Sequence, residues 1–289
     1  MRRVIVGSAL LLAASSAEAQ IADCPGTTIV ERGTQDACQK AVDLFAYMAP
    51  QFGAALVGGS HTPGQGGTLG GLPHFAVSLR ANGVFGSVPD VSAMNVSGTG
   101  RQSDQFATKN QVVPMPGVDA AIGLFKGLPL GLTNVGGVDL LLSATYVPSV
   151  DASDVSVEAP EGSLKIGYGA RVGLLQESLV MPGISLSYMK RDLPKLNLGA
   201  ATAGGSGTLN VTGLEIETTS WRLAVSKSLV AMTLGLGIGQ DRYGFKAEVA
   251  GSVGPTSSTP VAIDQSLTRT NVYGSFSLNM FVAKLVGEV

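Results

Sequence analysis

One segment of the chain alternates strictly between two kinds of side chain. Between residues 164 and 174, the even positions carry only apolar residues, namely Leu164, Ile166, Tyr168, Ala170, Val172 and Leu174, and the odd positions carry glycine, lysine or arginine. A period of two predicts a β-strand with one apolar face. Eleven residues is about twice the usual length of a soluble strand, and it matches the ~9–11 residues that a tilted strand needs to cross a bilayer.

The same alternation recurs along most of the chain. It is clear in residues 75–82, 138–146, 184–188, 221–226, 230–239 and 271–282, and weaker in 118–125, 208–216 and 243–250. Short turns alternate with long polar loops at 87–116, 150–162, 192–207 and 252–268. This layout is typical of outer-membrane barrels. We therefore expect an all-β, antiparallel transmembrane β-barrel of about 10–12 strands.

Composition excludes several other classes of protein. Charged residues make up 14% of the 289 residues, and 19 Lys and Arg nearly balance 21 Asp and Glu, so the basic surface that nucleic-acid binding needs is missing. A hydrophobic fraction of 45% argues against disorder. The 39 glycines do not recur every third residue, which excludes collagen.

The N-terminus has the pattern of a secretory signal peptide over residues 1–19. Arg2 and Arg3 precede an apolar run at 4–14, and Ala17 and Ala19 occupy the two positions that a signal peptidase reads. The apolar run is shorter than the ~20 residues of a membrane-spanning helix. In an exported chain, Cys24 and Cys38 form an even, close pair, which predicts one disulfide.

An amphipathic helix is expected just after the predicted disulfide. Its apolar face repeats at helical spacing, with Thr34 as a cap and Pro50 as the point where the helix kinks or ends. Its core positions are Ala41, Leu44, Phe45, Met48 and Phe52. A Gly-rich connector follows at 58–71. We therefore divide the chain into residues 1–19, an N-terminal plug or periplasmic segment at 20–71, and a barrel at 72–289.

Alternation alone does not show which face meets lipid, because soluble sandwiches and lipocalin-like barrels have the same period. The strand lengths, the small residues opposite the apolar faces and the signal peptide favour lipid outside. Tyr146, Tyr188, Trp221 and Tyr243 near strand ends are candidates for an aromatic girdle, although aromatic residues make up only 6% of the chain. The chain also ends at Val289 without a terminal aromatic strand.

Five charged residues lie opposite the apolar faces and are expected to face the lumen: Arg80, Asp139, Lys165, Arg171 and Arg222. Two interpretations of these charges remain open. They either set the selectivity of a channel or form ion pairs that fill a narrow lumen. Replacing Gly169, on such a polar face, with serine is expected to be much milder than replacing Ile166 or Val172 with arginine.

The sequence gives no sign of catalysis, cofactor or metal. The only two histidines, His61 and His74, lie in or beside the connector, and hydrolase, metalloprotease and nucleotide-binding motifs are absent. The acidic run Asp151, Asp154, Glu158 and Glu161 lacks the spacing of a calcium loop and is interpreted as a solvated loop. We do not expect an enzyme.

The order of helix, Gly-rich connector with Gly70-Gly71-Leu72-Pro73-His74-Phe75, and strands resembles the outer-membrane channels of the long-chain fatty-acid transporter type. The resemblance implies a bacterial outer-membrane barrel with an N-terminal plug that passes a small hydrophobic solute. Its expected partners are membrane lipid, that ligand and the barrel-assembly machinery, without nucleic acid. Two alternatives stay open: a structural or adhesive barrel without transport, and a soluble exported lipid-binding β protein.

Overall fold

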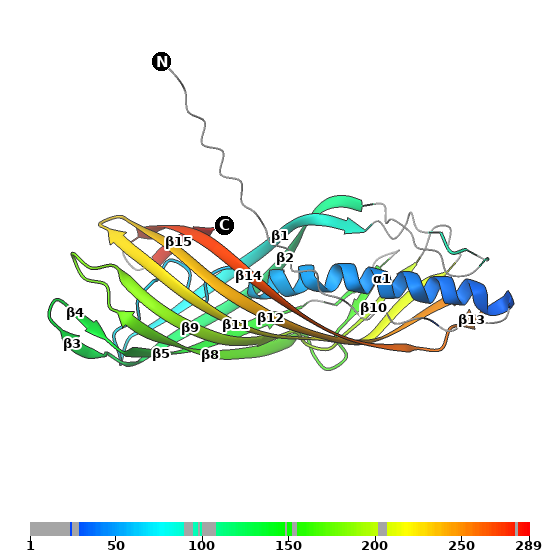
Figure 1. Cartoon of the computed structure of the whole chain (residues 1–289), viewed down its shortest axis with the longest axis horizontal. Helices are drawn as coiled ribbons and strands as arrows, with labels where there is room; N and C mark the ends of the chain where they lie inside the picture. The colour runs from blue at the N-terminus through cyan, green and yellow to red at the C-terminus, as the bar shows by residue number, and fades with distance from the viewer. Residues whose placement is uncertain are drawn as a thin grey trace, which may run out of the picture.

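The computed structural model describes residues 24, 29–89, 95–97, 99, 108–147, 149–151, 155–201, 207–280 and 283–289. One antiparallel sheet curls along the whole length of the molecule, and a single helix, α1 (Ile29–Val57), lies in one half of it (Figure 1). The all-β class and the helix near the N-terminus are as expected. Within the described residues, no helix is both long and apolar enough to cross a membrane.

Nine strands, each antiparallel to the next, form the curled wall. In order around the wall they are β1 (Phe75–Pro89), β2 (Thr108–Phe125), β5 (Gly137–Tyr146), β8 (Leu164–Leu175), β9 (Gly183–Asp192), β11 (Thr208–Leu229), β12 (Met232–Val253), β14 (Val261–Met280) and β15 (Ala283–Glu288). Because nine is an odd number, the two outer strands, β1 and β15, run in the same direction. No ladder joins them among the described residues.

Six short strands complete the sheets. β3 (Leu128–Leu130) and β4 (Thr133–Val135) form a hairpin between β2 and β5. β10 (Leu196–Ala201), β7 (Val155–Glu158) and β6 (Val150–Asp151) extend the sheet beside β11, and β13 (Thr256–Ser257) pairs with β12. The wall has fewer strands than the expected ten to twelve, because pairs of segments that the sequence separated join into β11 and β12.

The inner faces of β11 and β12 change character halfway along each strand. On β11 the buried residues Leu209, Val211, Leu214 and Ile216 are followed on the same face by Thr218, Ser220, Arg222 and Ser226. On β12 the change falls between Asp241 and Tyr243, and Tyr243 pairs with Thr218. The molecule thus has one half with an apolar interior and one half with a polar interior.

Helix α1 fills the half with the apolar interior. Ala41 and Phe45 of the predicted apolar face are buried against β11 and β12, and Leu44 and Phe52 pack partly buried beside them. The helix begins before Thr34 and continues through Pro50, so neither residue marks its end. The predicted disulfide between Cys24 and Cys38 is confirmed and lies in the same core.

Glycines allow close packing at two places. A Cβ at Gly251 of β12 would lie 2.3 Å from the amide nitrogen of Cys38, so this glycine lets the helix approach the strand. A Cβ at Gly169 of β8 would lie 2.2 Å from the carbonyl oxygen of Tyr188. A side chain added at Gly169 would therefore press on the backbone of β9.

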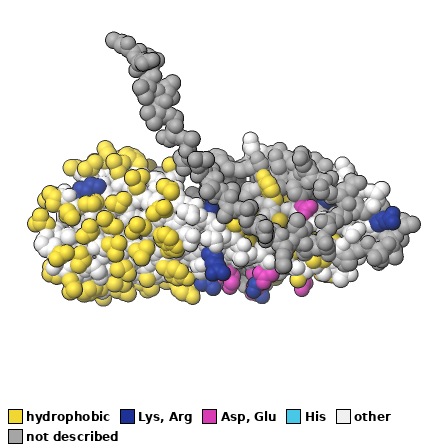
Figure 2. Space-filling view, in the orientation of Figure 1, with side chains coloured by type: hydrophobic (Ala, Val, Ile, Leu, Met, Phe, Trp, Pro, Cys, Tyr) yellow, Lys and Arg dark blue, Asp and Glu magenta, His cyan; other side chains and the backbone are white. Residues whose placement is uncertain are grey.

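The outside of the other half is apolar. Figure 2 shows hydrophobic side chains gathered over the half of the molecule that contains the short turns. We call this surface the apolar belt. Its exposed side chains include Leu79, Val118, Leu140, Val172, Leu186, Leu223, Leu236, Val272 and Leu278. The inner face at the same level carries Asp139, Ser143, Arg171, Ser187 and Ser226, all buried.

Aromatic residues stand where the belt ends toward the helical half. Tyr146, Tyr168, Tyr188 and Trp221 are exposed there, and Tyr188 pairs with Trp221. Tyr243, predicted as a fourth girdle residue, is instead buried against α1, because it lies on the inner face of β12, which is apolar from this residue onward.

Beyond this aromatic edge the outer surface becomes charged. Lys190 lies 3.4 Å from Asp192, and Lys195 lies 3.0 Å from Glu215 and 3.2 Å from Glu161. Hydrogen bonds to Glu215 and then to Glu161 raise the pKa of Lys195.

Candidate functional site

The Gly-rich connector at residues 58–71 runs through the polar interior, at the level of the apolar belt. The amide of Gly66 donates to the hydroxyl of Ser226 on β11 at 2.7 Å. The amide of Leu69 donates to Asp139 on β5 at 3.1 Å. The helix therefore lies beyond the belt, and the connector occupies the space inside it. This placement follows from side chains on several strands that bind the connector's backbone.

The first charged group joins β5, β8 and the connector. Arg171 on β8 is paired in register with Asp139 on β5, and its Nη2 lies 2.6 Å from an Asp139 carboxylate oxygen. The same guanidinium donates to Thr62 at 2.5 Å and to Gln65 at 3.3 Å. Both charged side chains are fully buried, so each satisfies the other in a space without bulk water.

The second group joins β11, β12 and the end of the helix. Arg222 lies 2.6 Å from Asp241 and donates to the carbonyl oxygens of Val57 and Gly59 at 2.9 and 2.8 Å. Asp241 also accepts hydrogen bonds from Asn271 and Tyr243. Arg222 therefore links the strand wall both to the last turn of α1 and to the start of the connector.

The third group joins β1, β2 and β9. Asp119 on β2 lies between two arginines, 3.2 Å from Arg80 and 3.1 Å from Arg191. One carboxylate is thus shared by two nearly buried guanidinium groups. The Nε atoms of both arginines lack a hydrogen-bond partner among the described residues.

His61 stands in the middle of the connector and is buried. Its two ring nitrogens contact the hydroxyls of Ser187 at 3.0 Å and Ser220 at 2.7 Å. No acidic side chain contacts the ring among these hydrogen bonds, so the contacts position the connector against β9 and β11. This arrangement differs from a hydrolase, in which a carboxylate orients the histidine.

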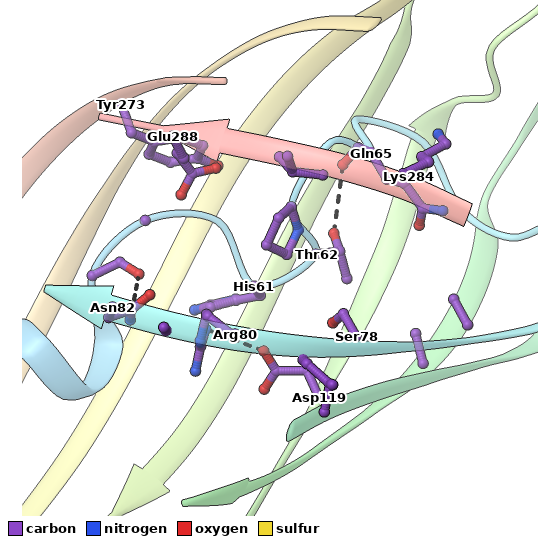
Figure 3. A pocket seen from close by; sticks show the side chains of 18 of the residues that line it. His61, Thr62, Gln65, Ser78, Arg80, Asn82, Asp119, Tyr273, Lys284 and Glu288 are labelled. Atoms are coloured by element: carbon purple, nitrogen blue, oxygen red, sulfur yellow. Dashed lines mark hydrogen bonds and ion pairs between the residues drawn. The ribbon is translucent and has the colours of Figure 1, made fainter. Parts of the chain in front are cut away.

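A cavity of about 1260 Å³ lies between the two outer strands of the wall, β1 and β15. Figure 3 shows it with His61, Thr62 and Gln65 of the connector on one side, Ser78 and Arg80 on β1, and Lys284 and Glu288 on β15. Outward-facing Phe75 and Leu79 of β1 and Leu285 of β15 line its outer edge. We call this cavity the lateral cleft.

Several polar atoms at the lateral cleft are buried without a hydrogen-bond partner among the described residues. They are Nε of Arg80, Oδ1 of Asn271 and Oε2 of Glu288. The other oxygen of Glu288 accepts a hydrogen bond from the amide of Ser60 at 2.5 Å. The cleft thus combines an apolar outer edge with a polar interior that has spare donors and acceptors.

The structure places the five predicted lumen charges in different surroundings. Arg80, Asp139, Arg171 and Arg222 belong to the three charged groups. Lys165 pairs in register with the inward-facing Thr145, but its side chain is exposed. Of the helix residues, Ala41, Leu44, Phe45, Met48 and Phe52 all lie on α1, beyond the belt.

Sequence reasoning missed Asp119, Arg191 and Asp241, which complete the ion pairs. Asp119 lies in a weakly alternating segment, and Arg191 and Asp241 lie just beyond clear ones. Their position on polar inner faces could have been found by continuing the alternation through residues 192 and 241. The residues of the acidic run at 152–154 lie outside the described part of the chain.

Comparisons with known proteins give no relative: no family model matches the chain, and no curated protein or solved structure matches it significantly. The likeness to fatty-acid-type channels accordingly stays one of layout.

Proposed function

We propose that this protein is a bacterial outer-membrane β-barrel that passes a small hydrophobic solute through its lateral cleft. The apolar belt supports the membrane part of this proposal, because exposed hydrophobic side chains cover strands from β1 to β15 and polar residues lie inside. The observation that carries the transport part is the cleft itself, an open cavity whose outer edge is continuous with the belt.

The polar interior supports low ion conductance along the barrel axis. The connector crosses it, and Arg171, Arg222 and His61 hold the connector through hydrogen bonds to its residues or to the strands beside it. Removing one partner of such a buried ion pair lowers the stability of the protein by several kcal/mol. We therefore expect these pairs to stay formed. We therefore expect small, infrequent currents from the protein in planar bilayers.

The lateral cleft suits a solute that arrives from or leaves into the hydrocarbon. Phe75 and Leu79 on one side and Leu285 on the other provide apolar contacts at its edge. The unpartnered Nε of Arg80 and the unpartnered oxygen of Glu288 can bind a polar group on the solute.

Tethering the two outer strands tests this route. The double variant Ser78→Cys/Val286→Cys places thiols on β1 and β15, on opposite sides of the cleft. The native cysteines are joined in a disulfide and leave no competing free thiol. Uptake of the fluorescent hydrophobic probe N-phenyl-1-naphthylamine by Gram-negative cells producing the protein is expected to fall several-fold after cross-linking with a bis-maleimide.

A matched tether controls for the effect of the linker. Leu223→Cys/Ile238→Cys joins β11 to β12, which are already paired, at outward-facing positions that do not line the cleft. Uptake is expected to stay unchanged in that variant. Equal uptake with and without the β1–β15 tether would contradict the lateral route. Producing cells with no more uptake than non-producing cells would favour the structural barrel, and a mature chain that stays in solution without detergent would favour the soluble lipid-binding protein.

A further inference from the structure

The turns at the belt end of the molecule carry exposed hydrophobic side chains at their tips. They are Leu128, Leu130 and Leu132 between β2 and β5, Leu179 and Val180 between β8 and β9, and Val230 between β11 and β12. Leu179 is 98% exposed, and Val230 is fully exposed. Turns that face water usually carry Gly, Asn, Asp or Ser instead. The three turns thus form one apolar end surface, which we call the turn tips.

Val230 shows that this apolar character is not a consequence of backbone geometry. Leu229 pairs with Met232, so Val230 and Ala231 form a two-residue hairpin turn. Val230 has a φ of 37°, and it is the only non-glycine residue with a positive φ in the described part of the chain. Turns of this length favour Asn or Gly at such positions, and a β-branched residue is strained there. Backbone geometry therefore does not explain why a valine stands at this position.

The polar groups of the turn between β8 and β9 are satisfied from within the protein. The ammonium of Lys227 donates to the carbonyl oxygens of Ser178 at 2.5 Å and Leu179 at 2.9 Å, and also contacts that of Met181. The carboxylate of Glu177 accepts a hydrogen bond from the amide of Ser228. A turn with inward-directed polar groups and outward apolar side chains is suited to surroundings without water.

The length of the apolar belt also indicates that the turn tips lie in surroundings without water. On β12 the outward face is apolar from Met232 to Ile238 and becomes polar at Gln240. The seven residues from Met232 to Ile238 span about 23 Å, and the turn adds about 3 Å, so the apolar stretch is about 26 Å along the strand, or about 20 Å at a tilt of ~40°. The apolar band of such barrels is ~25 Å tall, so the strand approaches this height only if the turn itself lies in the hydrocarbon.

We propose that the turn tips insert into the lipid bilayer, so that the barrel ends within the acyl-chain region and not in water. The proposal rests on the proposed membrane location. The occupant is lipid, because the apolar surface is spread over three turns and is continuous with the belt. A single protein partner would instead be expected to cover one compact patch.

Depth-dependent quenching tests the insertion. The variants Leu179→Cys and Val230→Cys, each with one free thiol beside the native disulfide, are labelled with the fluorophore NBD and reconstituted into phosphatidylcholine vesicles. Leu236→Cys in the belt and Gln240→Cys beyond it are the matched controls on one face of β12. We expect nitroxide-labelled acyl chains to quench the 179 and 230 labels as strongly as the 236 label. Iodide is expected to quench the 240 label at least fivefold more than these three.

Each other outcome has a defined meaning. Iodide quenching at 179 and 230 but not at 236 would overturn the insertion and leave the membrane location intact. Iodide quenching at all four sites would overturn both the insertion of the turn tips and the membrane location. Tips that are exposed in vesicles but protected in native membranes would show a protein partner and would also overturn the proposal. Leu179→Lys, compared with Gln240→Lys, gives a label-free measurement, with a lower assembly yield expected only for the first.

Discussion

Arg222 donates a hydrogen bond from Nη2 to the carbonyl oxygen of Val57, the last residue of α1, at 2.9 Å. The same guanidinium pairs with Asp241 across the β11–β12 ladder. A cation at the C-terminus of a helix satisfies a carbonyl that has no partner within the helix. This residue therefore stands at the boundary between the helical half and the belt half, and connects the two.

Replacing this arginine should destabilise the whole molecule. Arg222→Met leaves the buried carboxylate of Asp241 without its cation and removes three hydrogen bonds to backbone carbonyl oxygens, with an expected cost of about 3–5 kcal/mol. The measurement is unfolding in detergent, followed by the temperature of the gel-mobility shift. Arg242→Met, on the exposed face of the next strand, is expected to change stability by less than ~0.5 kcal/mol. The double variant Arg222→Met/Asp241→Asn should recover part of the stability that Arg222→Met loses. No recovery would contradict the argument that Arg222 stabilises the protein by pairing with Asp241.

The disulfide should stabilise the helical half. Closing the loop between Cys24 and Cys38, which are 14 positions apart, is expected to contribute about 3 kcal/mol. Non-reducing mass analysis of the mature protein should find the two cysteines joined, and Cys24→Ser/Cys38→Ser should unfold at a lower denaturant concentration. Two free thiols after alkylation of the freshly extracted protein would refute the bond.

The belt should reject charge on its outer face. Leu236→Arg is expected to cost ~2–4 kcal/mol and to reduce the yield of assembled protein, because the charge would face hydrocarbon. Gln240→Arg lies on the same face of β12, two outward positions further along, beyond the belt. It should assemble normally. Equal yields for the two variants would count against lipid around the barrel.

The contact between helix and strand should depend on Gly251. In Gly251→Val, the added side chain would overlap the backbone of α1 near Cys38 and displace the helix, so we expect a loss of about 1–3 kcal/mol from overpacking. A Cβ at Gly244, on the same strand, has no atom within 4 Å, so Gly244→Ala is the matched control. Thermal unfolding by circular dichroism compares them; an unchanged midpoint for Gly251→Val would mean that the helix packs elsewhere.

Part of this fold could be predicted from local sequence because strands and helices have different periods. The alternation at 164–174 predicts β8, which is observed over Leu164–Leu175. The repeat of Ala41, Leu44, Phe45, Met48 and Phe52 predicts a helix there. The disulfide was predicted from two close cysteines together with the expectation that the chain is exported. The strand and helix predictions depend only on residues that are close together in the sequence. The disulfide prediction depends on the cellular compartment expected for the chain.

Tertiary structure decided what each face meets. From Leu214 to Ser226 the side chains of β11 alternate between two faces without a break, yet Ile216 is buried against α1 while Arg222, on the same face, lies in the polar interior. Periodicity shows that a residue shares a face with its neighbours, but the surroundings of that face depend on segments far away in the sequence. Tyr243 was for this reason misplaced in the girdle.

The same reason explains why the sequence identified Asp139 and Arg171 as inward-facing charges but gave no ground for pairing Asp119 with both Arg80 and Arg191. Those pairs depend on the order of β1, β2 and β9 around the wall. The lateral cleft depends on the curvature that brings the first and last strands to opposite sides of one cavity. The sequence by itself thus determined the elements and their two faces, and the curvature of the wall around the connector decided which charges meet, because contacts between distant strands leave no local period.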